Sequence, residues 1–293
     1  MILIIGASGY LGNKLFLHLG MKGLQVTGTY YRNSANLPED KKIYLDLEKG
    51  DFSGISQLGN LTHIILCHGI SNIEQCKKES ALSNRVNVAN TLKLLEYFRN
   101  SDTVPVFFST NMVYSGRTKF PSESERPQPQ TEYGRQKLLV EEYIRSAFPK
   151  HIIIRPTKIF GVEKKDGTLL TLWMDKLLNG EKIMSAYDSF ISPVYIMDVL
   201  EAVERLIKKS QYGIFNLGNY EVLSVYNFSL KMVNFFHYEK SCVEKISIRD
   251  LHFIEERPRY NSVDCTKIKS FLHKDATAYE DCFKIIQHNY TIN

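Results

Sequence analysis

The first twelve residues, MILIIGASGYLG, constrain the fold of this chain more than any other stretch. Residues 1–5 are all apolar, too few for a membrane span or a secretory signal but enough for a strand buried on both faces. Glycine then recurs at Gly6, Gly9 and Gly12, and the apolar residues that follow are spaced as in a helix. A strand, a glycine turn and a helix in this order predict an α/β fold with a doubly wound parallel sheet.

The glycine turn also predicts a phosphate-binding site. Backbone N–H groups at a helix N-terminus, together with the positive end of the helix dipole, suit a pyrophosphate. Gly6 would make the tight turn, Gly9 would let the backbone approach the phosphates, and Gly12 would let helix and strand pack closely. A dinucleotide is therefore the expected ligand. An ordinary βα turn is the alternative, although such turns rarely need three glycines.

Bulk composition excludes several classes of protein. A chain of 293 residues can form one large α/β domain or a dinucleotide domain with a smaller lobe. The net charge of +5 comes without any block of like charges, so nucleic acid is not an expected partner, and neither is a membrane. The five cysteines are scattered and never in C-x-x-C spacing, which predicts no disulfide framework and no metal site. A reducing cytoplasm fits this usage best.

The end of the second predicted strand, residues 24–30, carries the information on cofactor type. An acidic residue at this place would bind the ribose 2′-hydroxyl of NAD, whereas an arginine accommodates the 2′-phosphate of NADP. The chain has no acid here and continues with Tyr31, Arg32 and Asn33. The guanidinium of Arg32 suits a phosphate, which favours NADP, with NAD as the other option. A solvated loop arginine is the alternative.

Two further strand ends carry polar residues. Residues 42–45 form the third predicted strand, and Asp46 follows it in a position that also suits a turn-capping Asp. Residues 63–67 form the fourth predicted strand, and His68 follows it. This histidine has no visible partner in the sequence, so a structural role is favoured over catalysis.

A tyrosine and a lysine share one face of a later helix. The fifth predicted strand, residues 104–109, leads into the polar loop FFSTNMVYSG, and a helix starts after Gln130 with Thr131 as its N-cap. Tyr133 and Lys137 are four residues apart on this helix, so the ammonium can lie near the phenol.

The regular alternation of strands and helices loosens after the sixth predicted strand, residues 151–155. We expect a Rossmann-type domain over residues 1–160 that carries the catalytic residues. Residues 161–293 are expected to form mostly a smaller substrate lobe, with some segments returning to the first domain. Helices are predicted over residues 169–178 and 197–207 and from Ser224 onward.

The turn GASGYLG, spaced G-x-x-G-x-x-G, resembles the extended branch of the short-chain dehydrogenase/reductase superfamily. With FFSTNMVY, Tyr133 and Lys137, SPVYIMDV, GIFNLGN and the run RPRYNSVD, nearly the whole chain resembles the dTDP-4-dehydrorhamnose reductase family. This resemblance implies NADPH- or NADH-dependent reduction of the C4 ketone of a nucleotide-linked 4-keto-6-deoxy sugar, late in the synthesis of cell-surface saccharides. The implied partner is a nucleotide sugar; the oligomeric state stays open, with a homodimer as one option.

The resemblance also implies roles for individual residues. Thr110 matches the catalytic Ser/Thr of the family, Tyr133 its acid and Lys137 its ribose-binding lysine. Asn87 matches an Asn that bridges its helix to the neighbouring strand. The implied cofactor-binding set is Gly6, Ser8, Gly9, Tyr10, Leu11, Gly12, Tyr31, Arg32, Asn33, Asp46, Leu47, Cys67, His68, Gly69, Tyr133, Lys137 and Pro156. The implied substrate-binding set is Asn111, Met112, Lys158 and Arg257.

The chemistry requires the same residue types. Hydride arriving at a carbonyl carbon builds charge on the oxygen, which must then receive a proton from a nearby acid. We expect the Lys137 ammonium to lower the pKa of the Tyr133 phenol toward neutrality, and Thr110 to orient the carbonyl by hydrogen bonding.

Two departures from the family pattern bear on the substrate. Ser109, Thr110 and Asn111 stand where rhamnose-forming reductases usually have Ser-Thr-Asp, and Lys158 stands where an aromatic residue is usual. Met112 also departs from the Thr-Asp-Glu of dehydratases, which argues against dehydration. Two alternatives remain open: an epimerase that keeps NAD bound, and a non-catalytic NADP-binding regulatory subunit like the β subunit of methionine adenosyltransferase.

Overall fold

The computed structural model describes residues 1–34, 36–56 and 58–291. These residues group into two compact units. The first unit comprises Met1–Val113, Pro127–Arg155 and Val203–Phe215, and the second comprises Tyr114–Arg126, Pro156–Ala202 and Asn216–Asn293. Each unit is therefore discontinuous in sequence.

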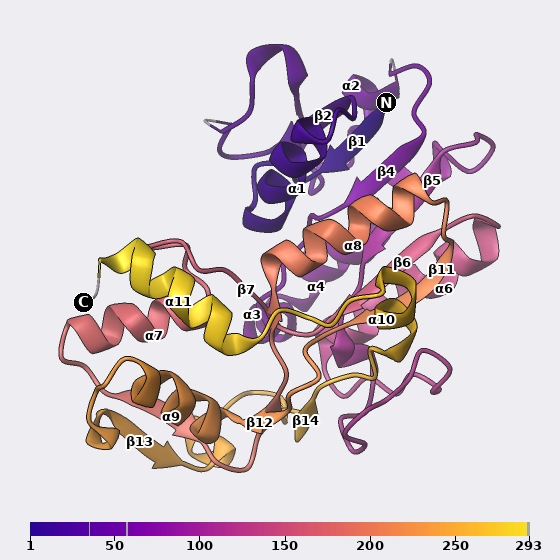
Figure 1. Ribbon diagram of the computed structural model, residues 1–293. Coiled ribbons are helices and arrows are strands. Elements are labelled where there is room, and N and C mark those ends of the chain that lie inside the picture. Colours follow the sequence, from indigo (N-terminus) through magenta and orange to yellow (C-terminus); the bar gives the residue numbers. More distant parts are fainter. Residues whose placement is uncertain (35, 57, 292–293) are drawn as a thin grey trace. The chain divides into compact units, whose positions relative to one another are not determined.

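A seven-stranded sheet in the order β11-β6-β5-β4-β1-β2-β3 forms the centre of the first unit (Figure 1). Its strands are β1 (Ile2–Ile5), β2 (Val26–Tyr30), β3 (Lys42–Tyr44), β4 (His63–Leu66), β5 (Val104–Phe108), β6 (Ile152–Pro156) and β11 (Gly213–Leu217). The pairings of β1 with β2 and β4, of β2 with β3, of β4 with β5 and of β5 with β6 are all parallel. The predicted doubly wound α/β fold is confirmed.

Helices cover both faces of this sheet because the central strands are apolar on both sides. Leu3 and Ile5 of β1 point into one core, shared with apolar residues of α5 (Asn90–Glu96) and α6 (Glu132–Ala147). On the other face α1 (Tyr10–Met21) contacts β1 and β2. His18 of α1 lies 2.7 Å from Glu204 of α8 (Ile196–Lys208), which places the second half of α8 beside α1. The remaining short elements of this unit are η1 (Glu39–Lys41), α2 (Ser53–Ser56) and α3 (Ile73–Lys78).

The helical segment over residues 80–96 is divided into three pieces. α4 (Ser80–Asn84) is followed by a π-helical turn, η2 (Arg85–Ala89), and then by α5. The side chain of Asn87 accepts a hydrogen bond from the Ile70 N–H (2.8 Å) and donates to the Ile70 carbonyl (2.9 Å). It also donates to Gln136 of α6 at 2.8 Å. Asn87 therefore bridges this helix to the segment after β4, and the wider π turn accommodates it.

The second unit has its own aromatic core, formed by Trp173, Phe228, Tyr279 and Phe283 among others. Its helices are α7 (Leu169–Leu178), the first half of α8, α9 (Val225–Phe235), α10 (Thr266–Leu272) and α11 (Tyr279–Tyr290), with the 3-10 turns η4 (Lys240–Cys242) and η5 (Ile248–Leu251). Its strands are short: β7 (Ile159–Phe160), β8 (Ile183–Ala186), β9 (Phe190–Ile191), β10 (Val194–Tyr195), β12 (Leu223–Ser224), β13 (Val243–Ile246) and β14 (Tyr260–Asn261).

Catalysis by residues 1–160 and substrate binding mostly by residues 161–293 stay predictions. The chain passes from the first unit to the second between Arg155 and Pro156, and residues Val203–Phe215 belong to the first unit again.

Candidate active site

The glycine turn after β1 fits a phosphate group. Gly6 has a φ of +80°, and a Cβ on it would lie 3.0 Å from the backbone of His68. A Cβ on Gly12 would lie 2.2 Å from the Gly6 carbonyl oxygen, so only glycine lets α1 pack this close to the turn. Gly9 precedes α1 and has no side chain with which to cap the first N–H groups of the helix. The turn thus presents backbone donors in a cradle that side chains would fill, as a bound pyrophosphate requires.

The order of the strands places this turn at a topological switch point. β1 has β2 on one side and β4 on the other. The chain builds the sheet outward from β1 through β2 to β3, and then returns to the other side of β1 to form β4. In open α/β sheets the ligand lies in the crevice at the carboxyl ends of such strands. The glycine turn follows β1, and Cys67, His68 and Gly69 follow β4 at the same edge. Ser8 lies in the glycine turn, and Tyr10 and Leu11 begin α1.

The residues that follow β2 are exposed, whereas Asp46, which follows β3, is buried. Tyr31, Arg32 and Asn33 are exposed, and the Arg32 guanidinium carbon lies 5.3 Å from the centre of the Tyr31 ring. Asp46 is buried and accepts hydrogen bonds from the N–H groups of Glu48 (2.9 Å) and Lys49 (3.4 Å). Asp46 therefore caps its own turn, which was the alternative reading of this residue. Its contact with the adenine, like that of Leu47, stays a prediction.

Thr110, Tyr133 and Lys137 are brought together at the carboxyl end of β5. Thr131 caps α6 as predicted, accepting a hydrogen bond from the Gly134 N–H at 3.2 Å, which places Tyr133 in the first turn. The Thr110 hydroxyl lies close enough to the Tyr133 phenol to favour a lower pKa of that phenol. The Lys137 ammonium is buried, donates to the Phe108 carbonyl at 2.8 Å and lies 5.9 Å from the centre of the Tyr133 ring.

Gly134 is a site residue that the sequence did not reveal. A Cβ on it would lie only 2.3 Å from the Met112 carbonyl oxygen. The absence of a side chain lets the first turn of α6 lie against η3 (Asn111–Val113), next to Thr110. Glycine costs about 1 kcal/mol relative to alanine inside a helix, and its place directly after Tyr133 was the available signal.

Burial dominates the electrostatics of the pair. It raises the pKa of Tyr133 well above the ordinary value, and the nearby Thr110 hydroxyl opposes this only in part. Burial also lowers the pKa of Lys137 to about 8. We expected Lys137 to lower the pKa of Tyr133, but in the structure the pKa of Tyr133 is raised. Burial desolvates both groups, and a neutral phenol is the form that can donate a proton.

A buried ion pair connects the same helix, α6, to β6. Glu141, one turn after Lys137, accepts hydrogen bonds from Arg155 Nε at 3.0 Å and from Nη2 at 2.5 Å. Both side chains are almost completely buried, with 0% and 1% exposed. The charge of Glu141 also opposes the effect of burial on Lys137. No local sequence pattern indicates this pair, because its partners lie on different elements, α6 and β6.

The predicted substrate residues divide between the units. Asn111 is buried and Met112 half-buried in η3 of the first unit. In the second unit, Lys158 follows β6 with an exposed side chain whose pKa is lowered by partial desolvation, and Pro156 is the last residue of β6. Arg257, also in the second unit, holds its guanidinium carbon 4.4 Å from the centre of the Phe253 ring.

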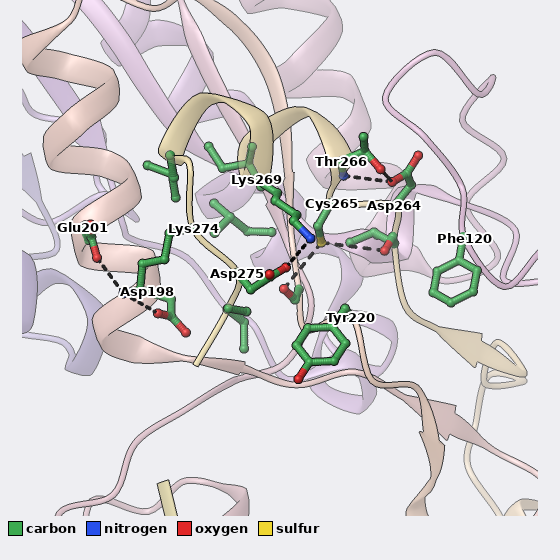
Figure 2. A pocket seen from close by; sticks show the side chains of 17 residues that line it. Phe120, Asp198, Glu201, Tyr220, Asp264, Cys265, Thr266, Lys269, Lys274 and Asp275 are labelled. Atoms are coloured by element: carbon green, nitrogen blue, oxygen red, sulfur yellow. Dashed lines mark hydrogen bonds and ion pairs between the residues drawn. The ribbon is translucent and has the colours of Figure 1, made fainter. Parts of the chain in front are cut away.

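The second unit contains a separate cavity of about 470 Å³ that the sequence analysis did not predict (Figure 2). Its charged groups pair with one another: Lys269 lies 2.6 Å from Asp275, and Lys274 lies 2.9 Å from Glu201. Within the described ranges no cluster of three or more metal-binding side chains occurs. Among all the residues that the structure describes, no helix is long and apolar enough to cross a membrane.

Comparison with known proteins decides the family. The RmlD substrate binding domain family matches residues 1–291. The chain belongs to this family. Membership confirms the resemblance to the dTDP-4-dehydrorhamnose reductases of the extended short-chain dehydrogenase/reductase type. It also confirms the class of activity, that of an NAD(P)-dependent oxidoreductase acting on nucleotide sugars.

Curated relatives span most of the chain at low identity. A probable low-salt glycan biosynthesis reductase, Agl14 of Haloferax volcanii, is 22% identical over 288 residues, covering 95% of this chain and 94% of its own. Methionine adenosyltransferase 2 subunit beta of Danio rerio is 21% identical over 291 residues, covering 97% and 88%.

Solved structures agree on the fold. dTDP-4-dehydrorhamnose reductase of Yersinia enterocolitica has a TM-score of 0.84 at 18% identity, covering 100% of this chain and 99% of its own. The Bacillus anthracis reductase in complex with NADP has a TM-score of 0.79 at 20% identity, covering 97% and 96%. UDP-glucuronic acid 4-epimerase of Bacillus cereus, in complex with UDP-glucuronic acid and NAD, scores 0.82 at 18% identity, covering 99% and 98%. Two of these neighbours are in complex with NADP or with NAD, the two cofactors that the sequence predicts for this chain.

Proposed function

We propose that this protein uses NADPH to reduce the C4 ketone of a nucleotide-linked 4-keto-6-deoxy sugar during the synthesis of a cell-surface saccharide. The observation that carries the proposal is the group formed by the Thr110 hydroxyl, the Tyr133 phenol and the buried Lys137 ammonium. This group lies at the same sheet edge as the glycine turn. The family and the glycan reductase among its relatives support the same conclusion.

The residues of the site suit the chemistry of a ketone reduction. When bound, the nicotinamide supplies a hydride to the carbonyl carbon, and negative charge then develops on the oxygen. Tyr133 donates its proton to that oxygen, and the raised pKa of the phenol keeps the proton in place until this moment. Thr110 orients the oxygen through its hydroxyl, and the nearby Lys137 ammonium stabilises the phenolate that remains.

Arg32 supports the preference for NADPH over NADH. It follows β2, is exposed, and has no acid beside it that would suit the ribose 2′-hydroxyl of NAD. Its planar guanidinium can bind a 2′-phosphate through two parallel hydrogen bonds.

Lys158 and Arg257 are the proposed substrate contacts of the second unit. Lys158 carries a compact charge where relatives usually place an aromatic residue, so it suits the pyrophosphate of the nucleotide or an acidic sugar. Arg257 holds its guanidinium against the Phe253 ring, and a guanidinium group suits an anionic part of the substrate.

A panel of 4-keto nucleotide sugars, varied in base and sugar and mixed with protein and NADPH, tests the proposal. Stoichiometric loss of reduced cofactor with at least one member is the expected result. Interconversion of a nucleotide sugar without net NADPH consumption would instead identify an epimerase. Tight NADP binding without turnover of any member would favour a regulatory subunit, as the similarity to a methionine adenosyltransferase subunit suggests.

A further inference from the structure

A loop that follows η3 is hydrogen-bonded to a later segment of the chain, residues 257–264. The N–H of Tyr260 donates to the Gly116 carbonyl at 3.0 Å, and the N–H of Asp264 donates to the Pro121 carbonyl at 3.0 Å. Both partners of each bond belong to the second unit. The loop is therefore fixed to the segment at two points.

β9 holds the same segment on the side opposite to the loop. The Arg259 carbonyl accepts a hydrogen bond from the Phe190 N–H at 2.8 Å, and the Asn261 carbonyl accepts one from the Ser192 N–H at 3.4 Å. The Asn261 side chain also donates to the Pro258 carbonyl at 2.9 Å. Successive residues of an extended segment direct their backbone groups to opposite sides, so this segment lies between the loop and β9. Its backbone therefore has little freedom to shift.

Gly116 of the loop lies in close contact with this segment. It is buried and has a φ of +67°. A Cβ built on Gly116 would lie 2.2 Å from the Cβ of Pro258 and 3.1 Å from the Tyr260 carbonyl oxygen. Carbon atoms that are not bonded to each other need roughly 3.5 Å. Only glycine therefore fits here while Pro258, which is buried too, keeps its place.

The place of Pro258 determines the direction of the side chain before it, that of Arg257. Proline fixes its own φ near about −65° and restricts the preceding residue to extended conformations. Arg257 thus leaves the backbone in a direction set by Pro258. At its other end, the guanidinium carbon of Arg257 lies 4.4 Å from the centre of the Phe253 ring. A shift of Pro258 would move the base of this side chain away from that arrangement.

We propose that Gly116 is a positioning residue for the substrate: its contact with Pro258 places Arg257 so that the guanidinium can bind an anionic part of the nucleotide sugar. The inference rests on the proposed function, in which Arg257 contacts the substrate. Gly116 follows Thr110 by six positions. A short stretch of chain thus connects the residue proposed to orient the ketone with the segment proposed to bind the rest of the substrate.

A double-mutant cycle of Gly116→Ala and Arg257→Ala tests the proposal, with a 4-keto nucleotide sugar that the wild type consumes. Arg257→Ala should raise the KM for this substrate by about tenfold to a hundredfold, the range for charge-assisted hydrogen bonds. Gly116→Ala should raise the same KM at least about fivefold in the wild type but less than about twofold in Arg257→Ala, because the side chain that it misplaces is then absent. The KM for NADPH should stay unchanged throughout.

Gly180→Ala is the matched control. Gly180 also belongs to the second unit and has a φ of +71°, but it is exposed and a Cβ on it would meet nothing within 4 Å. This change brings the same kind of backbone strain without the contact, so it should leave every KM unchanged. A nucleotide-sugar KM raised equally by Gly116→Ala and Gly180→Ala would attribute the effect to strain and overturn the proposal.

Two further results would overturn the proposal while leaving the proposed function intact. One is a wild-type KM in Gly116→Ala, and the other is an equal rise of KM with and without the Arg257 side chain. In contrast, an Arg257→Ala variant with the wild-type KM, or a wild type that consumes no member of the substrate panel, would contradict the proposed function itself.

Ser262→Ala provides a second variant should thermal unfolding show that Gly116→Ala does not fold. The buried Ser262 hydroxyl donates to the Lys119 carbonyl, so this change removes another contact between the same loop and segment. The KM for the nucleotide sugar should rise by roughly two- to fivefold, the scale of one hydrogen bond, and only where Arg257 is present. A wild-type KM in Ser262→Ala, or a rise that persists without Arg257, would contradict the proposal.

Discussion

Lys137 connects burial, charge and catalysis within a single side chain. Its ammonium donates a hydrogen bond to the Phe108 carbonyl and faces the rings of Phe107 and Tyr133. Cys67, Cys76 and Glu141 raise its pKa, yet burial outweighs them and lowers it to about 8. The proposed reaction needs the charged form of Lys137, and keeping a buried cation lowers the stability of the fold.

The pKa of Lys137 predicts how activity depends on pH. Loss of the ammonium proton above pH about 8 removes the charge that stabilises the phenolate. The kcat/KM for NADPH, which reports groups of the cofactor-free enzyme, should therefore decline by about tenfold per pH unit above that value. A steady-state pH profile measures this, and a flat profile through pH about 10 would contradict it.

The free energy of unfolding should rise with pH over the range in which activity falls. The folded pKa of Lys137 lies below its value of 10.5 in the unfolded chain, so between about 8 and 10.5 the unfolded state binds more protons. The free energy of unfolding gains a rising contribution from this group across that window. Urea titrations of the cofactor-free protein should show it, and Lys137→Met should lack it. Identical pH dependence of the two proteins would argue against a buried, depressed lysine.

Arg32 permits a test of cofactor choice. Charge-assisted hydrogen bonds to a phosphate contribute roughly 1.5 to 3 kcal/mol, so NADPH should be preferred over NADH by more than about tenfold. Arg32→Ala should remove most of that preference by raising the KM for NADPH alone. Arg145→Ala, which changes an exposed arginine of α6, is the control and should have no effect. Equal efficiency of both cofactors in the wild type would refute this assignment.

Predictability from sequence differs from residue to residue. The glycine turn, Tyr133 and Lys137 follow from local spacing, and the structure places them at one sheet edge as expected. The sequence left two roles open for Asp46, and the structure shows one of them, the capping of its own turn. The pairing of Glu141 with Arg155 depends on how α6 packs against β6, which no local pattern encodes.

At the scale of elements, α6 positions the proposed catalytic side chains through its close approach to η3. Gly134→Ala should disturb this approach, because the added methyl would meet the Met112 carbonyl, which is backbone and cannot move aside. We expect a loss of about 1 to 3 kcal/mol in stability, as in overpacked cores, together with reduced turnover.

Gly20→Ala in α1 is the matched control. Its new Cβ would find its nearest neighbour at 3.7 Å, an ordinary contact, so helix propensity alone should stabilise the protein by up to about 1 kcal/mol. Thermal unfolding and steady-state assays of both variants make the comparison. If Gly134→Ala were as stable and active as the wild type, the proposed packing of α6 on η3 would be incorrect.

Elements with a long apolar pattern were predictable, and short ones were not. The sequence predicts β4 and β5 to within a residue, and it predicts α7 with the bounds observed. The two-residue strands of the second unit are too short to show a period, and α10 and α11 were not foreseen. The π turn at η2 depends on the hydrogen bonds of Asn87 to Ile70, which lies far from it in sequence.

At the scale of the whole molecule, the chain divides its proposed tasks between two units. The first carries the glycine turn and the catalytic group, and the second carries Lys158 and Arg257. The sequence predicted that some later segments return to the first domain. It could not predict that residues 114–126 belong to the second unit, because this grouping depends on long-range packing.

Lys158→Ala tests the contribution of the second unit to substrate binding. The KM for the nucleotide sugar should rise several-fold while the KM for NADPH and the fold stay unchanged, since a charge contact serves ground and transition states alike. Lys182→Ala, which alters an exposed lysine of the same unit, is the control. Unaltered kinetics for the true substrate would mean that this departure from the family pattern says nothing about substrate.

The most direct test of ketone reduction by this site is the turnover of Tyr133→Phe, measured beside its affinity for NADPH. Removing one oxygen takes away the proton donor and leaves the ring, the glycine turn and Lys137 in place. With a 4-keto nucleotide sugar that the wild type consumes, turnover should fall by at least ~100-fold, the scale expected for loss of a general acid, while the NADPH affinity changes little. Turnover retained at the wild-type level would contradict the assignment of Tyr133 as the acid and the mechanism built on it.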